Sequence, residues 1–288
     1  LGGAGFYDST GQPAIFVGDT ARLYKVVAKA VTNVSKSGGY AADPDWQWSF
    51  EQFGDNVIAA ARGATLQRYQ IGSSSVFADI SGAPTAEVVF RVRSHLLACS
   101  GRTVNWSAFN DATDWTPDPA TQAGNTTVGQ DAGIIVAGIG GEQGALFQER
   151  GIIRIAYTGG DTVFQLDEVE GGRGACSPGA VRRWGRGAFV AAEDGFYFWD
   201  GLQAEAIGAG KVDRTFANDL NYPYRGRVTS AIDTASKCWM IAYPAGSSTY
   251  CNKQLIYSWA DQKWTHDDVP MQALFEMPRE GISADDAD

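Results

Sequence analysis

A recurring β-hairpin pattern constrains this chain more than any other feature of its sequence. Six times, an apolar strand-like run is followed by a tight turn and then by a second run rich in aromatic residues. Glycine in most of these turns accepts the positive φ that tight hairpins require. The pattern predicts a chain built from repeated small antiparallel sheets. The paired runs are Ala14–Gly18 with Ala21–Val26, Asn56–Ala61 with Thr65–Gln70, His95–Ser100 with Thr103–Ala108, Ala145–Gln148 with Ile152–Tyr157, Ala188–Ala192 with Phe196–Asp200, and Cys238–Tyr243 with Gln254–Trp259.

The spacing of the hairpins indicates which repeat this is. Equivalent positions in the six first strands lie 42, 39, 49, 44 and 50 residues apart, and they are Ile15, Val57, Leu96, Ala145, Phe189 and Trp239. Blades of β-propellers repeat at roughly 40–50 residues. A six-hairpin sandwich or a long meander is the alternative, because sandwiches also place turns at short intervals. The recurrence at about 45 residues favours the propeller.

Further strand-like segments flank most of the hairpins, which gives each repeat four strands, as in a propeller blade. The segments before the hairpins are Trp46–Phe53, Ala86–Arg93, Gly133–Ile139, Ala180–Trp184 and Arg227–Asp233. Those after them are Val76–Ile80, Asp114–Thr116, Thr162–Val169, Ala204–Ile207 and Lys263–Asp267. We therefore predict an all-β fold, a propeller-like array of about six four-stranded blades with one short helix.

The segments outside the repeats complete this prediction. Val212, Phe216 and Leu220 follow helical spacing, so Lys211–Asn221 is expected to form a short helix on the rim between the fifth and sixth repeats. Gln272–Met277 is predicted to be one more strand, which either begins a further blade or closes the ring. Residues 1–281 are expected to form a single domain with a truncated N-terminus, and residues 282–288 a frayed acidic tail.

Composition excludes several classes of protein. The formal net charge of −10 argues against a protein that binds nucleic acid by neutralising its phosphates. No apolar run approaches the roughly 18 residues that would span a bilayer. The four cysteines, Cys99, Cys176, Cys238 and Cys251, form no CxxC pair and are expected to be reduced, partly buried thiols.

No motif in the chain predicts a catalytic, cofactor-binding or metal-binding residue. His95 and His266 are expected to be surface or rim residues. The glycine-rich segment Gly138–Gly144 joins two predicted strands and is therefore expected to be a turn, because a dinucleotide loop needs a following helix. Asn110–Asp114 is expected to be a polar turn.

The carboxylates and arginines of the sequence leave two more specific functions open. A glycosidase would need two acids on opposite sides of a cleft, and the candidates are Glu142, Glu149, Asp161, Asp167, Glu168, Glu170, Glu193 and Asp194. Arg182, Arg183 and Arg186 predict a solvated edge with salt bridges, or a contact with an acidic partner surface.

Several short blocks, in a fixed order, resemble a family of structural proteins from tailed bacteriophages. The resemblance extends from about Gly38 to Thr265. The blocks are Trp106–Trp115, Gly140–Arg150, Phe164–Val169, Glu193–Gly201, Ile207–Arg214 and Leu255–Trp259. They are similar to segments of the tail hub, nozzle or packaged-DNA stabilisation proteins of short-tailed phages.

The resemblance implies a non-enzymatic virion protein of the phage tail with a propeller-like domain. It implies a ring-shaped homo-oligomer around the DNA channel, in contact with neighbouring tail, adaptor or portal proteins. DNA would pass transiently during ejection without sequence-specific binding. The protein would be made in the bacterial cytoplasm and carry no cofactor and no membrane span. A propeller module that binds a host glycan or receptor is the first alternative, and a propeller glycosidase is the second.

Overall fold

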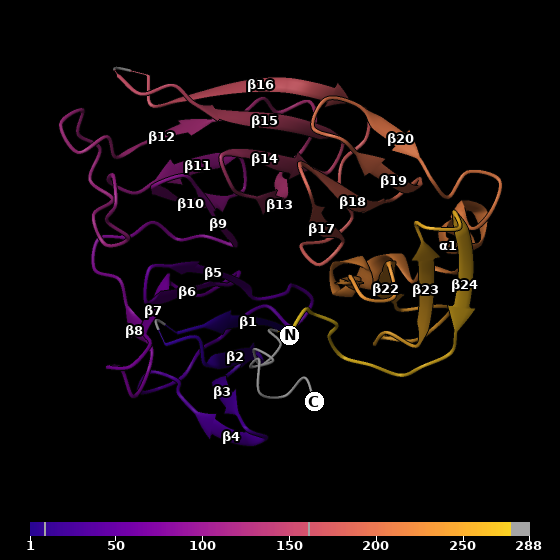
Figure 1. Ribbon diagram of the computed structural model, residues 1–288, viewed down its shortest axis with the longest axis horizontal. Coiled ribbons are helices and arrows are strands. Elements are labelled where there is room, and N and C mark those ends of the chain that lie inside the picture. The colour runs from indigo at the N-terminus through magenta and orange to yellow at the C-terminus, as the bar shows by residue number, and fades with distance from the viewer. Residues whose placement is uncertain (9, 161, 278–288) are drawn as a thin grey trace, which may run out of the picture.

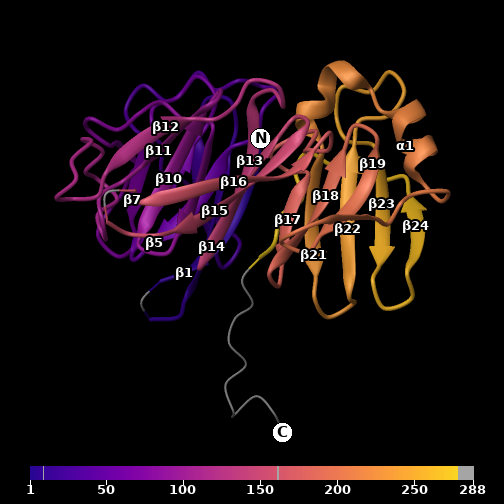
Figure 2. The ribbon, with the colours of Figure 1, turned by 90° about the horizontal axis from the view of Figure 1, so that it is seen from above.

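The computed structural model describes residues 1–8, 10–160 and 162–277, and it forms a six-bladed β-propeller (Figure 1). Each blade is a four-stranded antiparallel sheet whose strands follow one another from the central axis outward. Figure 2 shows the blades from the side, with β17 and β18 of the fifth blade beside β21 and β22 of the sixth. The predicted all-β fold with six four-stranded blades is confirmed.

The first three blades contain the strands β1 to β12. They are β1 (Gly2–Tyr7), β2 (Pro13–Gly18), β3 (Leu23–Val27) and β4 (Ala30–Asn33); β5 (Ser49–Phe53), β6 (Asn56–Ala60), β7 (Gln67–Gln70) and β8 (Ala78–Asp79); and β9 (Val88–Val92), β10 (His95–Ser100), β11 (Thr103–Trp106) and β12 (Gly124–Thr127).

The last three blades contain the strands β13 to β24 and two short helices. They are β13 (Ile135–Ile139), β14 (Gln143–Gln148), β15 (Gly151–Tyr157) and β16 (Phe164–Gly171); β17 (Val181–Trp184), β18 (Gly187–Ala192), β19 (Gly195–Trp199) and β20 (Ala204–Ala206); then α1 (Asp213–Asp219) and the 3₁₀ helix η1 (Tyr222–Arg227); and β21 (Thr229–Asp233), β22 (Cys238–Tyr243), β23 (Lys253–Ser258) and β24 (Lys263–Asp267).

Apolar side chains fill the spaces between consecutive blades. Five core clusters occupy the five spaces from the first blade to the sixth. Strand β18 illustrates the reason, because all six of its residues are buried although successive side chains point to opposite faces. A sheet that is apolar on both faces must be covered on both, and stacking against two neighbouring blades does this.

The helix α1 lies between the fifth and sixth blades, as predicted, but it is shorter than Lys211–Asn221. Its Phe216 is fully buried and packs against Phe196 of β19, with ring centroids 4.8 Å apart, and against Tyr243 of β22 at 5.0 Å. The 3₁₀ helix η1 follows, with proline in its first turn. The sequence pattern did not predict it.

The outer strand of the third blade was predicted in the wrong place. It is Gly124–Thr127, and Asp114–Thr116 lies in a loop. In that loop the Asp111 carboxylate accepts the N–H of Thr113 at 2.7 Å, and the Asp114 carboxylate accepts the N–H of Thr116 at 3.0 Å. Such Asx turns compete with sheet pairing.

Strands β1 and β4 were not predicted, and Gln272–Met277 is not a strand. Glycine-rich β1 has low strand propensity, but its glycines permit close packing near the axis. A Cβ atom on Gly2 would lie 2.7 Å from the carbonyl oxygen of Trp48, and one on Gly3 would lie 2.6 Å from the ring of Phe275. The predicted tail at 282–288 lies outside the described residues.

The C-terminal segment closes the ring by running between the inner strands of the last and first blades. The Thr229 hydroxyl on β21 donates to the carbonyl of Leu274 at 2.8 Å and accepts its N–H at 3.1 Å. The N–H of Ile232 donates to the Glu276 carboxylate at 3.1 Å. Phe275 meanwhile reaches β1 at Gly3. Residues 274–276 therefore join the two ends of the ring as a C-terminal latch.

We expect Thr229→Val to loosen this latch. The substitution keeps the shape of the side chain but leaves both polar groups of Leu274 without their hydroxyl partner, which should lower the free energy of unfolding by about 1–3 kcal/mol. Urea denaturation followed by tryptophan fluorescence measures this loss. Thr229→Ser keeps the hydroxyl and is the control; equal losses in both variants would contradict the hydrogen-bonding role.

Candidate functional site

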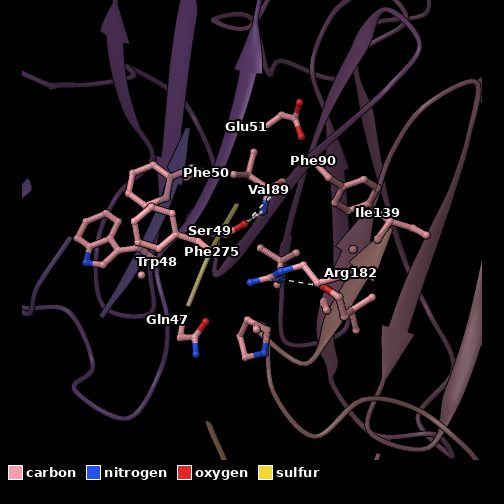
Figure 3. Close-up of a pocket in the computed structure, with 18 of the residues that line it drawn as sticks. Gln47, Trp48, Ser49, Phe50, Glu51, Val89, Phe90, Ile139, Arg182 and Phe275 are labelled. Carbon is pink, nitrogen blue, oxygen red and sulfur yellow. Dashed lines mark hydrogen bonds between the residues drawn. The ribbon is translucent and has the colours of Figure 1, made fainter. Parts of the chain in front are cut away.

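A central cavity of about 400 Å³ lies on the axis of the propeller, and Figure 3 shows some of its lining residues. All six inner strands contribute to its wall, and the C-terminal latch contributes Leu274, Phe275 and Glu276. Parallel bridges join Val92 with Gly141 and Gly179 with Thr229, so neighbouring inner strands run in the same direction. We call the end where the inner strands finish the C-side mouth and the opposite end the N-side mouth.

Polar side chains on β5 hold neighbouring inner strands together. The Ser49 hydroxyl donates to the carbonyl of Val89 at 3.1 Å and accepts its N–H at 3.0 Å, which Figure 3 marks. Two residues further along β5, the backbone N–H groups of Gln52 and Arg91 exert a lowering influence on the pKa of the Glu51 carboxyl group. Side chains thus satisfy backbone groups of β9 that face the axis.

Gln47 blocks the N-side of the cavity. Its side-chain amide donates to the carbonyl of Val228 at 2.9 Å and to that of Arg227 at 3.3 Å, on the segment that leads into β21. A Cβ atom on Gly179 would overlap the Gln47 amide oxygen, so glycine leaves the room that this crossing needs. The side chain therefore connects the second blade to the sixth across the axis.

Glu51 on β5 is one of two acids that line the cavity, with Glu276 of the C-terminal latch, and Figure 3 shows its side chain. Enclosure by the surrounding strands raises its pKa from 4.5 to about 7, against the opposing influence of the Arg91 and Arg183 charges. Near neutral pH, Glu51 is therefore present in both its protonated and its ionised form. The Glu51 carboxyl group can thus act as a hydrogen-bond donor when protonated and as an anion when ionised, near the charges of Arg91 and Arg183.

Arg182 is held inside the wall by backbone carbonyls. Its guanidinium donates to the carbonyls of Ser230 at 2.7 Å, Val181 at 2.8 Å and Leu274 at 3.4 Å. Burial lowers its pKa, and the nearby Glu276 charge opposes that shift. The predicted solvated edge is wrong for this arginine, because β17 is an inner strand. Arg183, the next residue, is exposed and donates to the carbonyl of Gly140.

A second, smaller hollow of about 150 Å³ lies at the N-side mouth. Arg225 brings two of the candidate glycosidase acids together there, with its guanidinium 3.7 Å from Glu149 and 3.3 Å from Glu193. The guanidinium of Arg62 stacks 3.8 Å from the ring centre of Trp46 in the same hollow. Both acids therefore share one arginine, which makes a salt-bridge role the best account of this pair.

The remaining candidate acids do not gather at that hollow. Asp167 pairs with Arg154 at 3.0 Å across β15 and β16, Asp194 pairs with Arg173 at 3.5 Å, and Glu142 pairs with Arg93 at 3.3 Å. Glu168 and Glu170 lie on β16, an outer strand. Asp161 lies outside the described residues.

His95 was predicted to lie at the surface, and this is wrong. It is fully buried between the third and fourth blades, where its ring packs within 6 Å of the rings of Phe109, Tyr157 and Phe164. Its Nδ1 lies 2.8 Å from the carbonyl of Ser107, and burial lowers its pKa. It opens β10 directly after a turn, a position that suggests exposure, but the neighbouring blade covers it. His266 is exposed on the outer strand β24, as expected.

The other predicted turns and thiols are confirmed. Within Gly138–Gly144, residues 140–142 form the turn from β13 to β14, and Asn110–Asp114 lies in a loop. None of the four cysteines forms a disulfide, and Cys99, Cys176 and Cys251 are buried. Within residues 1–8, 10–160 and 162–277, no three His, Cys, Asp or Glu side chains come close enough together to hold a metal ion. The same ranges contain no helix with the length and hydropathy of a membrane span.

Sequence analysis did not single out Gln47, Glu51 or Arg91. The available signal is weak: Gln47, Ser49 and Glu51 are polar residues at alternate positions of a strand-like run, and alternate residues share a face. That spacing places them on one side of β5 but cannot show that this side faces the axis.

Comparisons with known proteins identify a fold and no family. No family model and no curated protein match this sequence. A chain in the crystal structure of the mitotic checkpoint complex has a TM-score of 0.57 at 12% identity, over 94% of this chain and 83% of that one. YCF48 from Cyanidioschyzon merolae has a TM-score of 0.55 at 10% identity, over 93% and 84%.

The extracellular domain of the one-component system BT4673 from B. thetaiotaomicron is also similar, with a TM-score of 0.59 at 10% identity over 91% of this chain and 32% of that one. At such identities these likenesses concern the fold alone. Fold and cavity together define a six-bladed β-propeller module whose axis is bridged by polar side chains. Propellers support many unrelated functions, so function has to be argued from particular surfaces.

We expect Glu51→Gln to stabilise the protein more at pH 8 than at pH 5. The pKa of Glu51 is raised to about 7, so the folded state binds more protons than the unfolded state between 4.5 and 7, and stability falls as pH rises through that range. The amide removes this penalty. Melting temperatures of both proteins at the two pH values measure the difference.

Glu142→Gln is the control, because the side chain of Glu142 is 88% exposed near the same mouth. A gain from Glu51→Gln that is the same at both pH values would contradict the raised pKa.

Proposed function

We propose that this propeller is a non-enzymatic structural protein of a phage tail, of the hub, nozzle or DNA-stabilisation type, which assembles with copies of itself and with neighbouring tail proteins. The sequence blocks that resemble this family support the proposal. In the fold, Gly140–Arg150 spans β14 and the turns beside it, and Glu193–Gly201 spans β19 and its flanking turns. These blocks build blades, which suits a protein whose function is mechanical and architectural.

The observation that carries the self-assembly is the outer edge of the first blade. Strand β4 is the outermost strand, and all four of its residues are exposed. Val31 on β4 is 66% exposed, and Val27 beside it on β3 is 46% exposed. An exposed apolar edge strand can pair with a strand of another chain, because one row of its backbone groups is left without a sheet partner.

We assign a second copy of this chain as the occupant of the β4 edge. A ring of identical subunits uses two different patches of each subunit, so β4 of one copy would meet another surface of the next. The blade would then continue across the interface by main-chain hydrogen bonds, with Val31 covered by the neighbour. Neighbouring tail proteins would bind the faces that this ring leaves free.

The central cavity of one subunit is too small to carry duplex DNA. Its volume is about 400 Å³, and the Gln47 amide bridges it. A DNA conduit would therefore lie between subunits of the ring and not within one propeller. The net charge of −10 suits such a conduit, since a basic wall would hold phosphates and slow their passage.

We expect Val31→Lys to reduce self-association, because it places a charge on the β4 edge, which the neighbouring subunit would have to cover. Multi-angle light scattering across a concentration series should show a ring-sized mass for the unaltered protein and a monomer mass for the variant. Leu202→Lys is the matched control, because Leu202 is 65% exposed in a turn whose N–H groups already bond to Asp200.

If the unaltered protein stays monomeric at every concentration, the proposed self-assembly is wrong. If the Val31→Lys variant has the same mass as the unaltered protein, the proposed interface at β4 is wrong. The tail role has its own test, which is imaging of phage particles that carry a labelled copy of this chain. Label confined to the tail supports the proposal, and particles without label contradict it.

A further inference from the structure

The C-side mouth of the cavity concentrates arginines in a chain that is acidic as a whole. The net charge is −10, yet Arg91, Arg182 and Arg183 line the cavity. An adjoining open depression of about 360 Å³ is lined by Arg91 and Arg93 together with the polar side chains of Asn56, Ser94 and Asn110. Because Arg91 belongs to both hollows, they form one continuous basic surface, which we call the arginine mouth.

Two of these arginines lack a carboxylate partner. Arg93 pairs with Glu142 at 3.3 Å, and Arg182 is occupied by three backbone carbonyls. Among the described residues, no carboxylate oxygen lies within 4.0 Å of the Arg91 or Arg183 guanidinium. Both side chains belong to exposed residues, so their charges are available to a ligand that enters from the C-side.

The turn between β13 and β14 contacts both the Arg183 side chain and the backbone of Arg91. The N–H of Gly141 donates to the carbonyl of Arg91 at 2.9 Å, and the Arg183 guanidinium donates to the carbonyl of Gly140 in the same turn. Both arginines also act on the same carboxyl group, that of Glu51. Arg91 and Arg183 therefore line the same cavity as Glu51, from the third and fifth blades.

We propose that the arginine mouth binds a small organic carboxylate, whose charged group is shared by Arg91 and Arg183 and whose apolar body enters the cavity beside Ile139. Guanidinium groups recognise carboxylates through paired hydrogen bonds. A cavity of about 400 Å³ with both polar and apolar walls has the size of a small-molecule site. This size favours a free small molecule over a protein segment, and the site is separate from the proposed assembly edge.

Glu51 makes this binding dependent on pH. The charged groups that line the cavity with it are Arg91, Arg182, Arg183 and Glu276. When Glu51 is protonated it can donate a hydrogen bond to the ligand carboxylate, and when it is ionised it repels that carboxylate. Since its pKa is raised to about 7, affinity for a carboxylate should fall as the pH rises from 6 to 8.

Benzoate is a suitable probe, because its carboxylate matches the arginines and its ring matches the apolar wall. Isothermal titration of the full chain with benzoate at pH 6 should give saturable binding. Benzamide has the same shape without the charge, and it should bind at least tenfold more weakly. Affinity for benzoate should be lower at pH 8 in the unaltered protein, and Glu51→Gln should remove most of that pH dependence.

Arg183→Gln and Arg91→Gln should each weaken benzoate binding by about tenfold or more, since each removes a charge-assisted hydrogen bond. Arg186→Gln is the matched control, because Arg186 is an exposed arginine in the turn that follows β17 and does not line the cavity. It should leave the affinity unchanged.

Three results would overturn the site: no benzoate binding at pH 6, equal binding of benzamide, or unchanged affinity in both arginine variants. If the arginine variants fail to fold, the thermal shift of the unaltered protein decides the question. Benzoate should then raise the melting temperature where equimolar benzamide does not. Equal shifts with the two compounds would refute the proposal.

Discussion

Every other feature of this propeller depends on one constraint, which is that a blade with two apolar faces cannot remain uncovered. Val190 and Phe189, adjacent on β18, illustrate it: both are buried, one facing the fourth blade and the other facing the sixth. An antiparallel sheet with one polar face can expose that face to solvent, but a blade of this propeller has no polar face to expose. The blades therefore stack until they meet around an axis, and the ends of the chain have to join the ring.

The six inner strands and the C-terminal latch pack closely around the axis, and this close packing forms the wall of the central cavity. The axis is so crowded that glycine is needed at Gly2, Gly3 and Gly179, where a Cβ atom would overlap Trp48, Phe275 and Gln47 respectively. Backbone groups that face inward need partners, and Ser49 and Gln47 supply them from side chains. The enclosure that results also raises the pKa of Glu51, because an ionised carboxylate loses solvation between strands.

Local pattern was enough to predict most of the fold. Hairpins such as β18–β19 combine a glycine turn with two apolar runs, and their positions follow from turn chemistry and strand propensity. The prediction was wrong where local signals opposed tertiary packing. Glycine-rich β1 is a strand only because neighbours approach it, and Asp114–Thr116 is not one because Asp side chains capture its backbone.

The repeat, the number of blades and the central hairpins can be predicted from the amino-acid sequence, because they depend on residues close together along the chain. The set of polar residues that meet at the axis depends on tertiary contacts between blades. Glu51, Arg91 and Arg183 come from three different blades, and Thr229 and Leu274 are 45 residues apart. Such groups converge through the curvature of the closed ring, and no local spacing encodes that curvature. His95 became buried for the same reason, since the neighbouring blade covers a position that its own turn would leave exposed.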